Sequence, residues 1–170
     1  MLPADRQQQL TAAGLDPVDV ERVIASALEE DLDGGADVTS AATVPAEQQS
    51  VLDLVARTSG VVAGVPVAAA VFDIVGAGSL EVTLVRADGD AVQRGDVVVS
   101  AHGSTRDLLT AERTALNLLG HLSGIATHTA RWVVAIEGTG AKVRDTRKTI
   151  PGLRRLEKYA VRCGGGVNHR

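Results

Sequence analysis

The stretch Lys142-Val143-Arg144-Asp145-Thr146-Arg147-Lys148-Thr149 decides the fold prediction. A glycine-containing turn at 138–140 precedes it, so residues 142–145 are predicted to form a short strand. A helix is predicted next, over residues 151–163, because a proline starts it and three glycines at 164–166 stop it. A strand, a loop and a helix in this order form the unit that opens an α/β barrel.

Upstream of this unit, a helix is predicted over residues 105–137, with a break at Gly120 and Gly124. A further helix is predicted to begin at Asp16-Pro17, with aspartate as the N-cap and proline at the first helical position. It is expected to end in the acidic segment 29–39, which we interpret as a solvated loop in preference to a calcium or magnesium site.

Between these helices the pattern alternates between strand and helix. Strands are predicted at 51–58 and 80–86, a helix at 66–75, and a strand–turn–strand at 88–99. The last of these resembles the hammerhead hairpin of biotinyl and lipoyl carriers. Such carriers need a modifiable lysine, and residues 1–141 contain none, which excludes that function.

We therefore predict an α/β protein with three parts. Residues 1–24 form an N-terminal helical segment, residues 25–110 a hammerhead-like α+β sandwich domain, and residues 111–170 the first part of an open, TIM-like α/β barrel. A complete barrel typically takes about 250 residues. We expect the barrel to be incomplete in these 170 residues, as in a truncated chain.

Composition narrows the class of protein. Aromatic residues make up 2% of the chain and hydrophobic residues 45%, which predicts an aliphatic core and argues against a nucleic-acid surface that stacks bases. No apolar run reaches 18 residues, so no membrane span is expected. The N-terminus shows no signal-peptide pattern, and the single Cys163 has no partner for a disulfide, which favours the cytoplasm.

The charges are distributed unevenly along the chain. Residues 1–139 hold 8 Lys and Arg against 19 Asp and Glu, whereas residues 140–170 hold 9 against 2. The basic segment is suited to an anionic partner. An equally good interpretation is that it pairs with the acidic part of its own chain or of a neighbouring subunit.

Three places carry candidate binding residues. Arg147 and Lys148 follow the predicted strand, at the edge where α/β barrels hold their active sites, and can bind carboxylate or phosphate. His169 and Arg170 follow the three glycines, whose backbone can approach an anion. Arg113 lies on the long helix and points either to solvent or into a neighbouring subunit. The alternative for Arg147 and Lys148 is an exposed basic turn, and the alternative for the glycine segment is a flexible helix terminator. No spacing of the histidines suggests a metal site.

These segments occur in an order that resembles the quinolinate phosphoribosyltransferase family, also called nicotinate-nucleotide pyrophosphorylase (carboxylating). The resemblance is carried by Thr110-Ala111-Glu112-Arg113-Thr114-Ala115-Leu116-Asn117, Leu122-Ser123-Gly124-Ile125-Ala126-Thr127, Arg144-Asp145-Thr146-Arg147-Lys148-Thr149, Lys158-Tyr159-Ala160-Val161-Arg162 and Gly164-Gly165-Gly166-Val167-Asn168-His169-Arg170. The acidic segment with Glu30, Asp31 and Asp37 resembles the N-terminal signature of the family. The match covers most of the chain from about residue 20.

The resemblance implies an activity and roles for the candidate residues. Members of the family convert quinolinate and phosphoribosyl pyrophosphate, with Mg²⁺, to nicotinate mononucleotide, pyrophosphate and carbon dioxide, a step of NAD biosynthesis. By this resemblance Lys148 is catalytic and faces phosphoribosyl pyrophosphate and the ring, whereas substrate carboxylates are bound by Arg147, His169 and Arg170. Arg113 would reach the pocket of a partner subunit, which implies a homodimer or a higher homo-oligomer.

Two other interpretations stay open at this point. The chain is alternatively a related phosphoribosyltransferase of the molybdenum-transport-associated type, or a truncated, non-catalytic protein that dimerises. The family's Mg²⁺ ligands and a further lysine are expected beyond the motifs present here. We therefore expect the 170 residues alone to be inactive.

Overall fold

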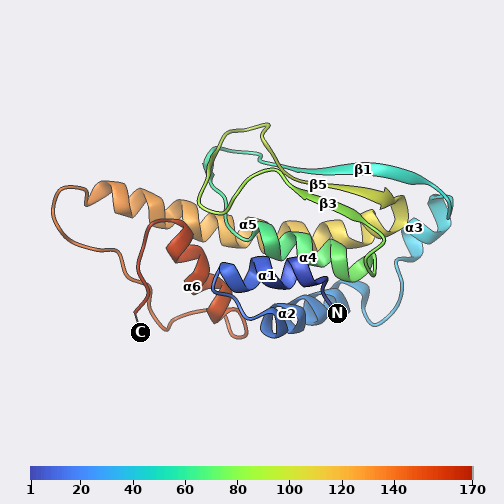
Figure 1. Cartoon of the computed structure of the whole chain (residues 1–170), viewed down its shortest axis with the longest axis horizontal. Coiled ribbons are helices and arrows are strands. Elements are labelled where there is room, and N and C mark those ends of the chain that lie inside the picture. Colours follow the sequence, from blue (N-terminus) through green and yellow to red (C-terminus); the bar gives the residue numbers. More distant parts are fainter. Residues whose placement is uncertain (170) are drawn as a thin grey trace.

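The helices and strands are described over residues 1–169 of a computed structural model (Figure 1). Arg170 lies outside the described residues. In chain order the elements are α1 (Ala4–Ala12), α2 (Pro17–Leu32), α3 (Val38–Thr43), β1 (Gln49–Val55), β2 (Gly60–Val61), α4 (Val65–Val75), β3 (Glu81–Leu84), β4 (Ala91–Val92), β5 (Val97–Ser104), α5 (Thr105–Ala135) and α6 (Arg154–Cys163). This mixture confirms the predicted α/β class.

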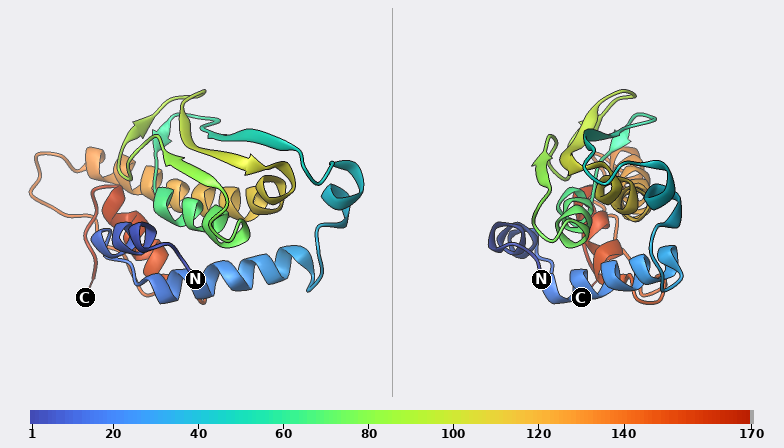
Figure 2. Two further views of the ribbon diagram at one scale, coloured as in Figure 1. Left: turned by 45° about the vertical axis from the view of Figure 1, so that its right-hand side comes forward. Right: turned by 90° about the vertical axis from the view of Figure 1, so that its right-hand side faces the viewer.

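The elements form layers. An antiparallel sheet in the order β1-β5-β3 covers one side of α4 and α5, and α2 lies on their other side (Figures 1 and 2). Val99 of β5 is paired with Leu54 of β1 on one side and Leu84 of β3 on the other. These three apolar residues lie in one row across the sheet. Strands β2 and β4 form a separate two-stranded ribbon.

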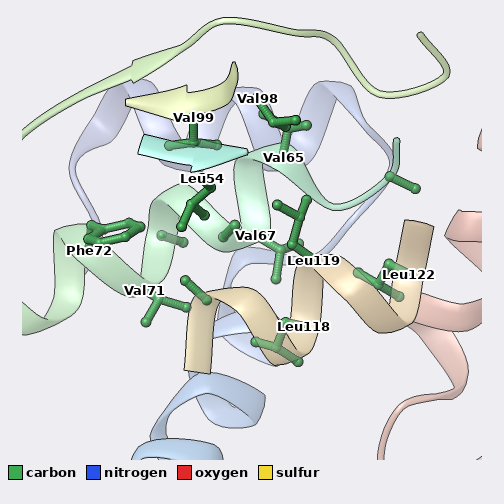
Figure 3. Packing of buried hydrophobic residues seen from close by; sticks show 14 of the residues in the cluster. Leu54, Val65, Val67, Val71, Phe72, Val98, Val99, Leu118, Leu119 and Leu122 are labelled. Atoms are coloured by element: carbon green, nitrogen blue, oxygen red, sulfur yellow. The ribbon is translucent and has the colours of Figure 1, made fainter. Parts of the chain in front are cut away.

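The core lies between the sheet and the two central helices (Figure 3). Helix α4 is apolar apart from Asp73 and is buried along nearly its whole length, which is typical of a helix enclosed by other elements. Leu54 and Val99 from the sheet meet α4 and α5 there, and the helices contribute Val67, Val71, Phe72, Leu118, Leu119 and Leu122. The core is aliphatic, as the composition predicts.

Helix α5 is continuous, so the predicted break at Gly120 and Gly124 is wrong. Both glycines face open space, and a Cβ added at either would meet no neighbouring atom. The opposite side of the helix is fixed by buried residues such as Leu119 and Leu122. That packing offsets the roughly 1 kcal/mol that a glycine costs inside a helix.

Several other local predictions can be compared with the structure. The helix start at Asp16-Pro17 is confirmed, because the Asp16 side chain accepts the N–H of Val18 at 3.0 Å. The prediction that residues 29–39 form a loop is wrong in part, because α2 continues to Leu32 and Asp37 caps the short helix α3. Residues 142–145 do not form a strand, and only a single parallel bridge joins Arg144 to Val167. Helix α6 begins at Arg154, three residues after the predicted start at Pro151.

No helix in the part of the chain that the structure describes combines the length and apolarity needed to cross a bilayer. The predicted domain limits at residues 24 and 110 stay predictions. The second of these limits falls within the continuous helix α5.

Candidate anion-binding site

A parallel contact brings the two basic segments together on either side of α6. The Val167 N–H donates to the Val143 carbonyl at 2.9 Å, and the Asp145 N–H donates to the Val167 carbonyl at 3.2 Å. Segments 143–145 and 167–169 therefore run side by side, with α6 as the connection between them. This is the arrangement of two neighbouring strands at the start of an α/β barrel.

Asp145 connects the two segments through its side chain. Its Oδ1 accepts the backbone N–H of His169 at 2.6 Å, and its Oδ2 accepts the Asn168 side-chain amide at 2.7 Å. The Nζ of Lys158, on α6, lies 2.7 Å from the same Oδ2. The side chain of Asp145 is only 6% exposed, so these groups are held together with little competition from water.

Lys158 and Asn168 close this network. Lys158 Nζ also donates to the His169 carbonyl at 3.2 Å, and the Asn168 amide also donates to the Lys158 carbonyl at 2.8 Å. Arg162, one turn further along α6, donates to Asn168 Oδ1 at 2.8 Å. The 167–169 segment is thereby fixed to α6 by side chains and to residue 145 by both backbone and side chain.

The network determines the charge state of Asp145. Burial acts most strongly and by itself would raise the pKa of this carboxyl. Hydrogen bonds from Lys158, from the His169 N–H and from Asn168 together outweigh burial, and the pKa of Asp145 is lowered below its ordinary value. Asp145 is therefore ionised at neutral pH and neutralises Lys158.

Arg147 and Lys148 lie in the exposed turn that follows Asp145. Within residues 1–169, neither side chain makes a hydrogen bond or an ion pair. The Thr146 hydroxyl accepts the Lys148 N–H at 3.0 Å and shapes the turn. The Thr149 hydroxyl accepts from Arg154 Nε at 3.1 Å, which ties the end of the turn to α6. Two cationic side chains are left facing solvent.

The structure separates Arg113 from the other candidate residues. Arg113 lies in the first half of α5, which begins beside α3, whereas residues 142–149 lie near α6 at the other end of the molecule (Figure 1). Its Nη1 lies 2.7 Å from Asp31 Oδ1, and the side chain is 71% exposed. Within one chain, Asp145 is thus joined to His169, and the turn with Arg147 and Lys148 follows Asp145 directly, whereas Arg113 lies apart from them. Arg170 lies outside the described residues.

The interpretation that the basic segment pairs with the acidic part of its own chain is confirmed in part. Arg155 Nη1 lies 2.5 Å from Asp19 and 3.6 Å from Asp16, both near the start of α2. Other cations, namely Lys158 and Arg162, bind groups within the site.

Among the described residues, no three His, Cys, Asp or Glu side chains form a group that could hold a metal ion. The carboxylates of the described residues are therefore not grouped in a way that fits a Mg²⁺ ion.

Sequence reasoning missed the residues that assemble the site. Asp145, Lys158 and Asn168 stand in the quoted segments but were given no role. The available signal was the acidity of Asp145, which is one of only two acidic residues in a strongly basic segment. Such a residue is expected to pair with a nearby cation.

Two family models together match most of the chain. Residues 37–123 match the family model "Quinolinate phosphoribosyl transferase, N-terminal domain", and residues 125–170 match the corresponding C-terminal domain. The chain therefore belongs to the quinolinate phosphoribosyltransferase family.

The similar proteins include enzymes and solved structures from several bacteria. The nicotinate-nucleotide pyrophosphorylase [carboxylating] of Mycobacterium leprae is 53% identical over 148 residues, which is 86% of this chain and 52% of the relative. A probable enzyme of the same description from Bacillus subtilis is 42% identical, over 81% of this chain and 47% of the relative. The crystal structure of NadC from Streptococcus pyogenes superposes with a TM-score of 0.86 at 44% identity, over 92% of this chain and 55% of that one. The chain spans about half the length of the curated relatives it matches.

Proposed function

We propose that this chain provides part of the active site of a decarboxylating phosphoribosyltransferase. The reaction joins quinolinate to the ribosyl carbon of phosphoribosyl pyrophosphate and yields nicotinate mononucleotide, pyrophosphate and carbon dioxide. The observation that supports this proposal is the junction made by Asp145, which joins the start of the Arg147-Lys148 turn to the His169 segment. Family membership supplies the substrate class.

The free cations suit the charges of these substrates. Quinolinate is a dianion, and phosphoribosyl pyrophosphate carries more negative charge still. Arg147 offers a planar fork that can bind one carboxylate through two hydrogen bonds, and His169 offers a second contact from the adjacent segment. Arg170, although outside the described residues, is proposed to complete this carboxylate site. Lys148 is proposed as the catalytic cation that faces the pyrophosphate-bearing sugar and the ring.

The chemistry asks mainly for positioning and electrostatics. The ring nitrogen attacks the ribosyl carbon while the bond to pyrophosphate breaks, and the electron pair of that bond leaves with pyrophosphate. The nitrogen is then cationic, so the ring accepts the electron pair released when the 2-carboxyl departs as carbon dioxide, and a proton replaces it. Arg147 and His169 would hold the ring in line with the sugar, and Lys148 would stabilise the departing negative charge.

Arg113 is proposed to act in the site of a second subunit, so that the working protein is a homodimer or a higher homo-oligomer. Its separation from residues 145–149 of its own chain and its 71% exposure support this proposal. Asp31 holds the Nη1 edge of the guanidinium and leaves the rest of the group directed outward. We propose a cytoplasmic location, supported by the single cysteine, and partners that are small anions and not nucleic acid.

Calorimetric titration of quinolinate into the protein tests the carboxylate site. Arg147→Ala should weaken binding by roughly 10- to 100-fold, because hydrogen bonds to charged groups are worth about 1.5–3 kcal/mol. Lys142→Ala is the matched control, since this exposed cation lies five residues earlier in the same segment and outside the turn. Equal loss in both variants, or no binding by folded wild-type protein, would contradict the proposal.

A further inference from the structure

A polar contact that the proposed site does not use joins the loop between β3 and β4 to α6. The Tyr159 hydroxyl donates to Asp88 Oδ2, and these residues are 71 positions apart in the chain. Asp88 Oδ1 accepts the N–H of Val65, the first residue of α4, at 2.9 Å. One carboxylate thus caps a buried helix of the sandwich and binds α6 at the same time.

Helix α6 also packs against α5. Tyr159 and Ala160 are buried, and Gly164 at the end of the helix lies directly on α5. A Cβ at Gly164 would come within 2.3 Å of the Ala126 carbonyl oxygen, so the two helices approach as closely as their backbones allow. This contact limits the approach of α6 to α5 at the C-terminal end of α6, and the Asp88 contact acts on another part of the same helix.

Consecutive residues of α6 connect the two sides. Tyr159 binds Asp88, whereas Lys158 binds Asp145 Oδ2 at 2.7 Å and the His169 carbonyl at 3.2 Å. Neighbouring side chains on an α-helix point about 100° apart. A rotation of α6 that broke the Tyr159 contact would therefore also displace Lys158 from Asp145.

We infer that Asp88 is a positioning residue for the anion-binding site. Through Tyr159 it sets the rotation of α6, and through Lys158 the place of Asp145 and of the 167–169 segment. Asp88 is proposed to act through Tyr159 and not through contact with the substrates. The inference rests on the proposed function in one respect: it takes the segments 145–149 and 167–169 as the carboxylate site.

Hydrogen exchange tests the coupling without any need for activity. Tyr159→Phe removes only the hydroxyl, and Asp88→Asn keeps the size of the side chain, so it serves as the second variant if the first folds poorly. The backbone amides of Asp145 and Val167 report on the junction, and the amide of Val99 in the central strand reports on global opening. Asp90→Asn is the matched control, because Asp90 lies in the same turn and its side chain, within residues 1–169, bonds only the Ala87 N–H.

The expected result is exchange roughly 10- to 100-fold faster at Asp145 and Val167 in either variant, with Val99 unchanged, as follows from the loss of one hydrogen bond to a charged group. The control should leave all three amides unchanged. The inference is overturned if exchange at the junction stays at the wild-type rate, or rises only in step with Val99, as a purely stabilising contact would give.

Quinolinate affinity separates this inference from the proposed function. In a protein that binds quinolinate, Tyr159→Phe should raise the Kd several-fold although Tyr159 does not contact the ligand, and Asp90→Asn should not. If the wild-type protein binds no quinolinate, the proposed function fails, and the exchange rates at Asp145 and Val167 still decide whether Asp88 positions the junction.

Discussion

Replacing Arg6 with methionine is expected to lower the free energy of unfolding by about 3–5 kcal/mol, because it leaves a buried carboxylate without its partner. Arg6 Nε, on α1, lies 2.6 Å from Asp73 Oδ2, on α4. The two side chains are only 5% and 7% exposed, so water cannot replace the lost contact. Domains of this size are stable by about 5–15 kcal/mol, and the loss would be a large share of that margin.

Urea unfolding at pH 7, followed by far-ultraviolet circular dichroism, measures this loss as a shift of the midpoint at constant slope. Arg22→Met is the matched control, since Arg22 pairs with Asp19 at 3.8 Å and is 62% exposed, and it should cost less than about 1 kcal/mol. Adding Asp73→Leu to Arg6→Met should recover most of the loss, because no unpaired charge then remains. A cost for Arg6→Met no larger than that of the control would refute the reasoning.

Three further predictions follow from other parts of the structure. Gly164→Ala should lower the Tm by several degrees, because its Cβ would lie 2.3 Å from the Ala126 carbonyl oxygen, whereas Gly120→Ala, in open space, should raise it slightly. The lowered pKa of Asp145 means that its stabilising contribution is present above the pKa of the unfolded chain and is lost as the pH falls through the folded value; Asp145→Asn should remove this dependence from a series of Tm measurements at pH 2–6. Burial, followed by the charge of Asp88, raises the pKa of the single tyrosine, Tyr159, so absorbance at 295 nm should not rise near pH 10 while the protein stays folded, and a normal titration there would contradict the contact.

The sequence predicted those elements whose cause is local. Asp16 and Pro17 act within one turn of their own helix, and the β-branched run at 97–99 forms a strand wherever a sheet is available. The buried helix α4 was predicted from its apolar residues alone. In each case the residues that determine the element are the residues of the element.

The predictions that failed depend on the surroundings of a segment. The strand at 142–145 needs a partner along its length, and within residues 1–169 it has one bridge, to Val167. Gly120 and Gly124 would end an isolated helix, but the packing of Leu119 and Leu122 keeps α5 continuous. Neither outcome can be calculated from the spacing of residues within the segment.

The residues of the site also fall into those that the sequence indicated and those that it did not. The basic turn and the segment after the glycines were identified as candidates because their composition is unusual, and the structure pairs residues 143–145, just before the turn, with the segment that begins at Val167. The role of Asp145 was not foreseen, because it depends on contacts with residues 13 to 24 positions away. The roles given to Arg147, Lys148 and His169 remain proposals that binding and kinetic measurements must test.

The most direct test of the carboxylate site compares quinolinate with nicotinate, which lacks the 2-carboxyl group, in calorimetric titrations of the same protein. If Arg147 and the His169 segment bind the two carboxylates jointly, quinolinate should bind at least about tenfold more tightly than nicotinate, and Arg147→Ala should reduce this preference. Equal affinities for the two ligands, or an unchanged preference in Arg147→Ala, would contradict the assignment of these residues to the carboxylates.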